Sequence, residues 1–144
     1  MSAFTIKEAL AKDAGPIADL LKELGYARTL AFARRKITVL SRSDSDTVLV
    51  AEVQGRVVGL AHLHLAELFH EKGLLGRVMA IVVNKEARQA GVGTKLMSSV
   101  EKLARDAGCV KMEVTSGIQR DWAHAFYRKL GYIEEPKRFV KVLE

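Results

Sequence analysis

RVMAIVVNKEARQAGVGTKLMSSVEKLARDAG, from Arg77 to Gly108, is the stretch that decides the fold of this chain. It begins with an apolar run over residues 78–83, which predicts a buried strand covered on both faces. A polar turn and two glycines, Gly91 and Gly93, then lead into an amphipathic helix. The first backbone N–H groups of a helix lack intrahelical partners, and the helix dipole adds partial positive charge there. Because glycine lets the backbone approach an anion closely, this stretch predicts a phosphate site at the helix N-terminus.

Length and composition are typical of one folded domain, which we expect to cover residues 1–144. Hydrophobic residues make up 49% and charged residues 28%, values that argue against disorder. No apolar run approaches the ~20 residues of a membrane span, the N-terminus has no apolar signal core, and a single cysteine cannot form an internal disulfide. These features predict a cytoplasmic protein without membrane contact. The net charge of +6 favours an anionic ligand and raises nucleic acid as a rival partner.

The hydrophobic pattern before the central strand predicts a strand, two helices and two further strands. Asp13 is placed to cap the first helix, and Gln54-Gly55 to form a tight hairpin between the two later strands. A polar connection over residues 66–73 then leads to the central strand. The predicted elements are a strand near Phe4, helices over residues 13–25 and 29–40, and strands over residues 47–53 and 56–65.

After the central helix the pattern predicts a strand, a short helix and a paired tail. The strand over residues 109–115 alternates, with Val110, Met112 and Val114 on one face and Glu113 on the other. The helix over residues 119–130 is expected to turn Trp122 and Phe126 inward, and the tail over residues 132–143 to form two strands around Pro136. The whole order is β-α-α-β-β-β-α-β-α-β-β, an α/β fold with a mixed sheet and a βαβ unit around the glycine turn.

Two motifs give this order a family resemblance. Arg88-x-x-Gly91-x-Gly93 lies between a strand and a helix, although two glycines at a helix start also occur in ordinary connections. Downstream, Ala123-His124-Ala125-Phe126-Tyr127 is followed after three residues by Gly131-Tyr132. Both closely resemble motifs of the GNAT superfamily of N-acetyltransferases, and the resemblance covers essentially the whole chain. It implies a GNAT fold, acetyl-CoA as cosubstrate without a metal, and direct transfer of the acetyl group to a primary amine.

The resemblance also implies roles for individual residues. Backbone groups of the central strand would bind the pantetheine amides, and the glycine loop, with Arg88 nearby as a cation, would bind the pyrophosphate. Tyr127 would be the general acid for the coenzyme A thiolate, although its spacing also fits a core aromatic. The cofactor-binding residues implied in this way are Ile81, Val82, Val83, Arg88, Gln89, Ala90, Gly91, Val92, Gly93, Thr94 and Tyr127.

This sequence departs from the family pattern at two positions. Met79 stands where many members carry a glutamate that acts as the general base, and Arg120 stands in place of an asparagine. Glu113 is therefore the tentative base, and His62 and His64, which share one strand face, are further candidates. An exposed strand face is the alternative for the two histidines, and water without a side-chain base is also open. Glu67 and His70 also lie before the central strand.

The acceptor amine is not readable from the sequence. Phe69 and His70, in the connection before the central strand, are expected to shape its pocket. The basic stretch Arg34-Arg35-Lys36 favours an acceptor with negative charge, or else is a solvated helix face. The alternative to an enzyme is a regulatory module of the same fold that binds acyl-CoA with little turnover. The sequence argues against nucleic-acid binding, because its positive charges are spread along the chain and few aromatic residues lie among them. A homodimer is suggested by the resemblance alone.

Overall fold

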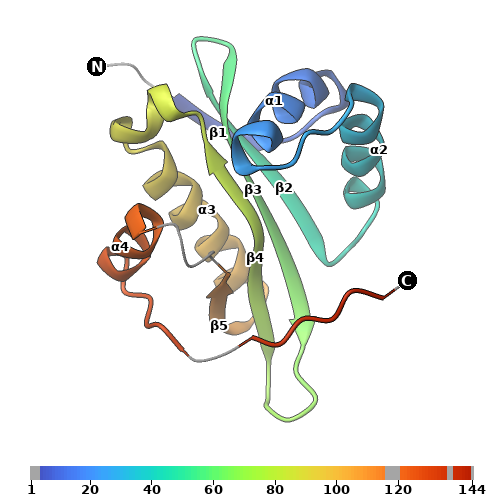
Figure 1. Cartoon of the computed structure of the whole chain (residues 1–144). Helices are drawn as coiled ribbons and strands as arrows, with labels where there is room; N and C mark the ends of the chain where they lie inside the picture. Colours follow the sequence, from blue (N-terminus) through green and yellow to red (C-terminus); the bar gives the residue numbers. More distant parts are fainter. Residues whose placement is uncertain (1–3, 116–120, 136–137, 144) are drawn as a thin grey trace.

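The computed structural model describes residues 4–115, 121–135 and 138–143, and within them a five-stranded sheet carries helices on both faces (Figure 1). The strands are β1 (Phe4–Glu8), β2 (Asp46–Val53), β3 (Arg56–Glu67), β4 (Leu74–Val83) and β5 (Cys109–Val114). The helices are α1 (Ala14–Leu24), α2 (Leu30–Ser41), α3 (Val92–Asp106) and α4 (Asp121–Lys129), with short 3-10 helices η1 (Ala11–Asp13) and η2 (Lys85–Ala90).

The strands lie in sequence order, β1-β2-β3-β4-β5. The first four pair antiparallel, whereas β4 and β5 pair parallel, with α3 as the crossover between them. The predicted mixed sheet with a βαβ unit is therefore confirmed. The hairpin between β2 and β3 is also confirmed, because Gln54 and Gly55 take φ values of 52° and 77°, the left-handed pair that matches the twist of the strands.

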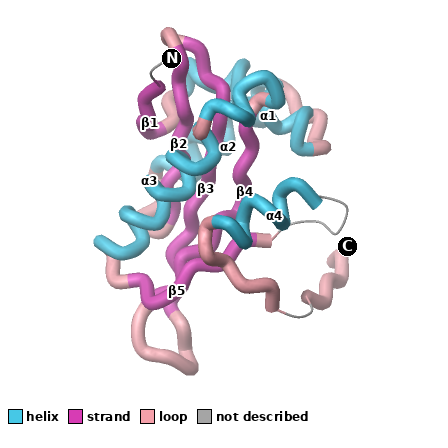
Figure 2. Tube along the Cα trace, turned by 90° about the vertical axis from the view of Figure 1, so that its left-hand side faces the viewer, coloured by secondary structure: helices cyan, strands magenta, loops and turns pink. Residues whose placement is uncertain are grey.

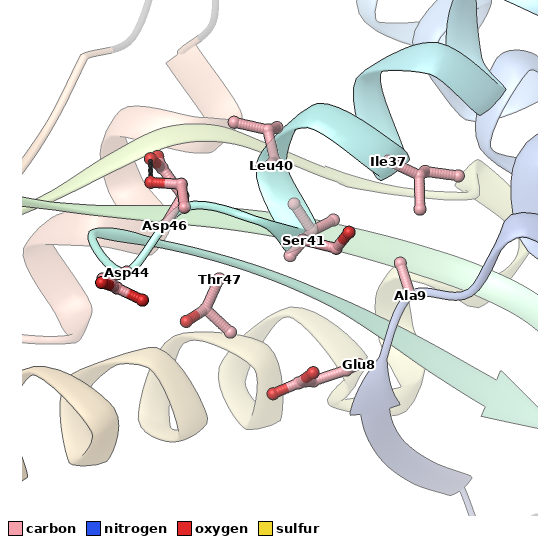
Figure 3. Close-up of a pocket in the computed structure, with 10 residues that line it drawn as sticks. Glu8, Ala9, Ile37, Leu40, Ser41, Asp44, Asp46 and Thr47 are labelled. Carbon is pink, nitrogen blue, oxygen red and sulfur yellow. Dashed lines mark hydrogen bonds between the residues drawn. The ribbon is translucent and has the colours of Figure 1, made fainter.

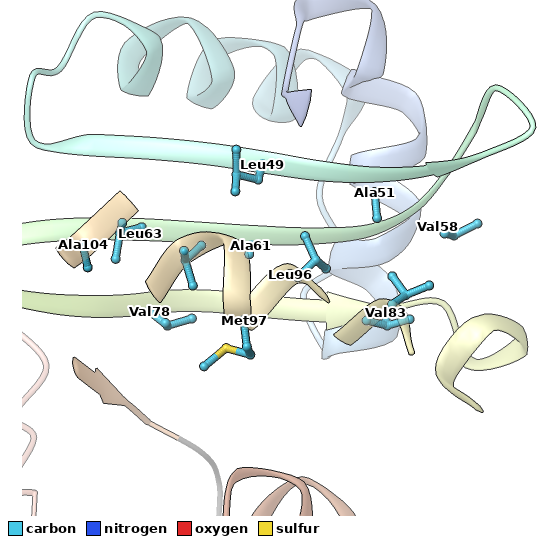
Figure 4. Close-up of a cluster of buried hydrophobic side chains, with 12 residues drawn as sticks. Leu49, Ala51, Val58, Ala61, Leu63, Val78, Val83, Leu96, Met97 and Ala104 are labelled. Atoms are coloured by element: carbon cyan, nitrogen blue, oxygen red, sulfur yellow. The ribbon is translucent and has the colours of Figure 1, made fainter. Parts of the chain in front are cut away.

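Two hydrophobic cores lie on opposite faces of the sheet. Helices α1 and α2 cover one face, and α3 crosses the other (Figure 2). Helix α4 packs on the α3 side through Phe126. The buried side of α3 meets Leu63 and Val78 of the sheet through residues such as Leu96 (Figure 4). Strand β4 serves both cores, because Val78 and Val83 face α3 whereas Val82 faces α1 and α2. This explains why the central strand is apolar at consecutive positions.

The entry to α1 differs from the prediction. Asp13 does not cap this helix; its Oδ2 accepts the backbone N–H of Leu10 at 2.8 Å and lies 3.6 Å from Lys7 Nζ. The carboxylate, with a side chain only 5% exposed, thus closes the turn that precedes α1. The predicted end of α1 is confirmed, since Gly25 adopts φ 110° and its N–H bonds the last turn.

The sheet ends at β5 in the described residues, and the two predicted tail strands are wrong. Residues 132–135 and 138–143 have no regular secondary structure, and the predicted turn at Pro136 lies outside the described residues. Side chains of the tail such as Phe139 and Val142 are largely exposed, so this segment lies away from any strand that would supply backbone hydrogen bonds.

Strand β5 also departs from simple alternation. The register with β4 shifts from Leu74–Cys109 to Leu75–Lys111, which leaves Val110 as an extra residue. Val110 is consequently 58% exposed, so the prediction that it shares a face with Met112 and Val114 is wrong. Met112 and Val114 both pack against the core under α3.

Candidate active site

The sheet opens along the second half of β4. Strand β5 pairs with β4 only as far as Val78–Val114. Residues 79–83 of β4 therefore have no strand partner on that side in the part of the chain that the structure describes. On the other side, β3 stays paired, but Leu63 lies opposite Val78 and His62 opposite Ala80. Met79 is therefore the extra residue of a β-bulge, and it is 52% exposed. Because a bulge bends its strand, β4 turns away from β5 at this residue.

The open edge of β4 presents backbone groups in an alternating pattern. The N–H of Asn84 donates to the carbonyl oxygen of Val58 at 2.8 Å. Because hydrogen-bonded and non-hydrogen-bonded pairs alternate in an antiparallel ladder, Ile81 and Val83 direct their backbone groups away from β3 and into the opening. These are two of the strand residues implied to bind pantetheine.

A helix N-terminus follows directly on this edge. Gly91 joins η2 to α3 with φ 82°, and the N–H of Lys95 donates to its carbonyl oxygen at 3.1 Å as the first bond of the helix. The N–H groups of Val92, Gly93 and Thr94 precede that bond and have no intrahelical acceptor. Arg88, Gln89 and Ala90 lie in η2 immediately before the junction.

The two glycines serve different purposes. A Cβ on Gly91 would meet no atom within 4 Å, so this glycine is required by its left-handed backbone and leaves open space over the helix end. A Cβ on Gly93 would lie 3.2 Å from Cζ of Phe126, so this glycine allows α4 to pack on α3.

Arg88 has a partner that the sequence did not indicate. Its Nε donates to the carbonyl oxygen of Val83 at 3.2 Å, and its guanidinium lies 4.6 Å from the ring centroid of Trp122. Trp122 is 55% exposed, so the prediction that it faces the core is wrong. The inward face of α4 carries Ala123 and Phe126 instead, and Trp122 lies beside the glycine loop.

Tyr127 sits on the side of the sheet that α3 covers. Its ring is part-buried against that core, with centroids 5.3 Å from Phe126 and 6.1 Å from Tyr132. Gly131, with φ 94°, turns the chain so that the N–H of Tyr132 donates to the Tyr127 carbonyl at 3.0 Å. The Tyr132 hydroxyl donates to Glu101 at 2.7 Å, and burial together with that carboxylate raises the pKa of Tyr132. The Gly-Tyr end of the second motif thus supports Tyr127.

The opposite face of the sheet carries a polar row across four strands. Asp46 of β2 pairs with His64 of β3, His64 with Arg77 of β4, and Arg77 with Glu113 of β5. Asp46 Oδ1 contacts His62 Nε2 at 2.7 Å and His64 Nδ1 at 3.0 Å. Glu113, the tentative base, accepts a hydrogen bond from Arg77. The structure therefore gathers Glu113 and both histidines on one face, although they are distant in the sequence.

Residues 16–132 match the sequence profile of the acetyltransferase (GNAT) family. The chain belongs to this family. It is 35% identical over 89 residues to an aminoalkylphosphonate N-acetyltransferase of Salmonella typhimurium, an alignment covering 62% of this chain and 58% of that protein. It is 31% identical to an aminoglycoside N(6')-acetyltransferase of Stenotrophomonas maltophilia, over 96% of this chain and 92% of the relative. An aminoglycoside N-acetyltransferase solved in complex with CoA shares the fold, with a TM-score of 0.85, 18% identity, and coverage of 100% of this chain and 96% of that one.

This GNAT chain places its two tentative acceptor residues at a distance from the bulge. Phe69 and His70 are exposed at the tip of the β3–β4 hairpin, next to Leu74. Five residues of β4 separate Leu74 from Met79, about 17 Å at the rise of a strand. The structure does not bring these two side chains to the polar row, and their contact with an acceptor stays a prediction.

A cavity of about 240 Å³ lies on the face that α1 and α2 cover, between α2 and the start of β2. Its lining includes Ile37, Leu40 and Ser41 of α2, together with Asp44 and Asp46 (Figure 3). The cavity gives solvent a route to the Asp46 end of the polar row. In the parts of this GNAT chain that the structure describes, no helix is long and apolar enough to cross a bilayer, and no group of three His, Cys, Asp or Glu side chains is arranged to hold a metal ion.

Proposed function

We propose that this chain is an N-acetyltransferase that moves the acetyl group of acetyl-CoA directly to a primary amine. The observation that supports it most strongly is the continuity of two features, the open edge of β4 and the N-terminus of α3. An unpaired strand edge suits the amide groups of a pantetheine arm, as it suits an added peptide strand. A helix N-terminus a few residues further along suits the pyrophosphate of the same molecule.

Each part of the donor then has named residues. The backbone groups of Ile81 and the N–H of Val83 bind the pantetheine amides, whereas Val82 pairs with β3 and the Val83 carbonyl accepts from Arg88. The N–H groups from Gln89 to Thr94 bind the pyrophosphate. Arg88, held against Trp122, supplies positive charge beside the phosphates. The thioester lies near the bulge, where β4 leaves β5 and both faces of the sheet can reach it.

The chemistry is attack by the neutral amine on the thioester carbonyl. A C–N bond forms, the C–S bond breaks, and coenzyme A leaves as a thiolate. Tyr127 donates the proton that the sulfur takes, as a general acid on the α3 side of the sheet. The carboxylate of Glu113, the tentative base, already accepts a hydrogen bond from Arg77. Substitution of Glu113 by glutamine tests whether it also takes a proton in the reaction.

The test begins with calorimetric titration of acetyl-CoA into the full chain and into Gly91→Glu. The new carboxylate would enter the open space over the helix end, so binding should be abolished by steric clash and like charge. Gly25→Glu is the matched control, because Gly25 also ends a helix with positive φ and open space at its Cβ, yet lies at the end of α1. Equal affinity of wild type and Gly91→Glu for acetyl-CoA would refute the donor site.

Turnover is measured as release of the coenzyme A thiol with a panel of amines. An aminoalkylphosphonate and an aminoglycoside belong in the panel, because relatives carry those names. A regulatory module that only binds acyl-CoA is the second candidate, favoured by the exposed Met79 at the bulge where many members carry a glutamate. Micromolar binding of acetyl-CoA without acetylation of any amine would select the module over the enzyme.

A further inference from the structure

Asp46 is the centre of a hydrogen-bonded side-chain cluster that takes no part in the donor site or in the steps given above. One carboxylate oxygen, Oδ1, contacts ring nitrogens of both His62 and His64, and the other, Oδ2, accepts the hydroxyl of Ser43 at 2.7 Å. The side chains of Asp46 and His62 are 11% and 18% exposed, whereas that of His64 is 38% exposed. Each oxygen of this largely buried carboxylate therefore has a partner.

The carboxylate decides which nitrogen of each histidine carries hydrogen. Partial burial alone would raise the pKa of Asp46, but hydrogen bonds from Ser43, His62 and His64 outweigh it and hold that pKa below its ordinary value. An ionised carboxylate can only accept, so His62 must present Nε2–H and His64 must present Nδ1–H. When the rings are neutral, the lone pairs are left on His62 Nδ1 and His64 Nε2.

The position of His62 distinguishes it from His64. His62 lies opposite Ala80, beside the bulge where β4 leaves β5. Asp46 holds Nε2, so Nδ1 is the ring nitrogen of His62 that this carboxylate leaves available. His64 instead lies opposite Arg77, in the part of β4 that is still paired with β5.

The two faces of the sheet then offer complementary groups at the opening. His62 stands on the face covered by α1 and α2, since its strand neighbour Leu60, two residues earlier, belongs to that core. Tyr127 packs on the face covered by α3. An amine that enters from one face and a sulfur that leaves toward the other would each meet a titratable side chain.

We propose that His62, held by Asp46, accepts the proton of the acceptor ammonium. The inference rests on the proposed function. The ammonium gives one proton to Nδ1 of His62, and the neutral amine forms the C–N bond as the C–S bond breaks. A second amine proton is lost to water, Tyr127 protonates the thiolate, and water restores the tyrosine. The sum converts an ammonium and acetyl-CoA into an amide, coenzyme A and one released proton.

Other groups near the opening fit this role less well. Met79 cannot take a proton, and Glu113 is engaged with Arg77. The other charged and titratable groups of the polar row are Asp46 from β2, His64 from β3, Arg77 from β4 and Glu113 from β5. Lys7 and Glu52, on the same face, pair with each other at 3.1 Å. From α2, the side chains at the cavity beside Asp46 are Ile37, Leu40 and Ser41, which carry no charge. The imidazole is thus flanked by one bonded carboxylate and a second histidine.

The kinetic test compares wild type with His62→Gln, using an amine that the wild type acetylates. Glutamine can still donate to Asp46, so the cluster keeps a hydrogen bond while the basic nitrogen is lost. We expect kcat to fall about 100-fold, the usual lower range for loss of a general base, with the Kd of acetyl-CoA unchanged. His62→Ala should regain activity when imidazole is added, a rescue that a merely structural role would not produce.

Asp46→Asn should lower kcat as well, because an amide no longer fixes the His62 tautomer. Asp44→Asn is the matched control: it removes the same charge two residues away, from an exposed side chain in the same cavity, and should leave kcat unchanged. Wild-type kcat in His62→Gln, or no rescue of His62→Ala, overturns the role of His62 while acetyl transfer stands. Binding of acetyl-CoA with no turnover by the wild type removes the reaction itself and this role with it.

A measurement on the wild type alone guards against variants that fail to fold. Long-range proton–nitrogen correlation spectra report which ring nitrogen of each histidine is protonated. Near neutral pH we expect His62 to carry hydrogen on Nε2 and His64 on Nδ1. Hydrogen on Nδ1 of neutral His62 would leave the lone pair on Nε2, against Asp46, and would overturn the proposal whatever the activity.

Discussion

The two faces of the sheet meet at the open half of β4, and they are built in different ways. On the α3 face, the residues implied to bind the donor lie close together in the chain, from Ile81 to Thr94, with Tyr127 supplied by one later helix. On the α1/α2 face, the polar row takes one residue from each of four strands, from Asp46 to Glu113. A site made of a contiguous loop can be recognised as a motif, whereas a site made by strand register cannot.

The largest effect that sharpens this comparison should come from Tyr127→Phe. Removing the hydroxyl on the α3 face should lower kcat about 100-fold with little change in the Kd of acetyl-CoA, because the acid acts only on the leaving thiolate. Tyr132→Phe is the matched control, since its hydroxyl bonds Glu101. That variant should lower the free energy of unfolding by about 1 kcal/mol, with a much smaller change in kcat. Turnover of Tyr127→Phe equal to wild type at every pH would exclude Tyr127 as the acid.

Gly93→Val tests whether the α3 face depends on close packing of α4. The side chain would press on the Phe126 ring, so the free energy of unfolding should fall by about 1–3 kcal/mol, measured by urea titration. Ser98→Val is the comparison, because it places the same side chain at an exposed position of the same helix; its change should stay within about 0.5 kcal/mol. Equal stability of the two variants would contradict the contact between Gly93 and α4.

The α1/α2 face should show its own dependence on pH. Because the pKa of Asp46 is lowered in the folded chain, its stabilising effect is present above the pKa of the unfolded chain and is lost as the pH falls through the folded value. Asp46→Asn should therefore cost about 1 kcal/mol near neutral pH, and its stability curve should converge with that of wild type in acid. Asp44→Asn should show no such convergence. A constant gap between wild type and Asp46→Asn at all pH values would contradict the assignment.

The smallest expected effect is at Trp122. Trp122→Leu removes the ring beneath Arg88, a contact worth about 0.5–1 kcal/mol at an exposed site. The affinity for acetyl-CoA should fall only a few-fold, measured by the same calorimetric titration, and kcat should be unchanged. Trp122→Tyr, which keeps an aromatic face, should recover most of the affinity. A loss as large as that of Gly91→Glu would mean that Trp122 itself, rather than Arg88, meets the donor.

The parts of this chain that were predicted well share short-range causes. Gln54-Gly55 forms the expected hairpin because its two residues take left-handed backbone angles by themselves. Gly91 begins α3 as predicted because its positive φ and the amphipathic pattern that follows it are local properties, whereas the polar turn expected before it is the 3-10 helix η2. The errors have long-range causes. Val110 is turned outward by a register shift against β4, and Trp122 is exposed because Ala123 and Phe126 occupy the face that meets α3.

By itself, the sequence determined the mixed sheet, the βαβ unit and the loop that belongs to the GNAT family, since these depend on periodicity and on glycines within one continuous stretch. Only the tertiary structure decided that Met79 sits on a bulge, that the tail adds no strand among the described residues, and that Asp46 holds His62 and His64. The reason is physical: a strand pattern states which side chains share a face, but pairing with neighbouring strands sets which of them touch.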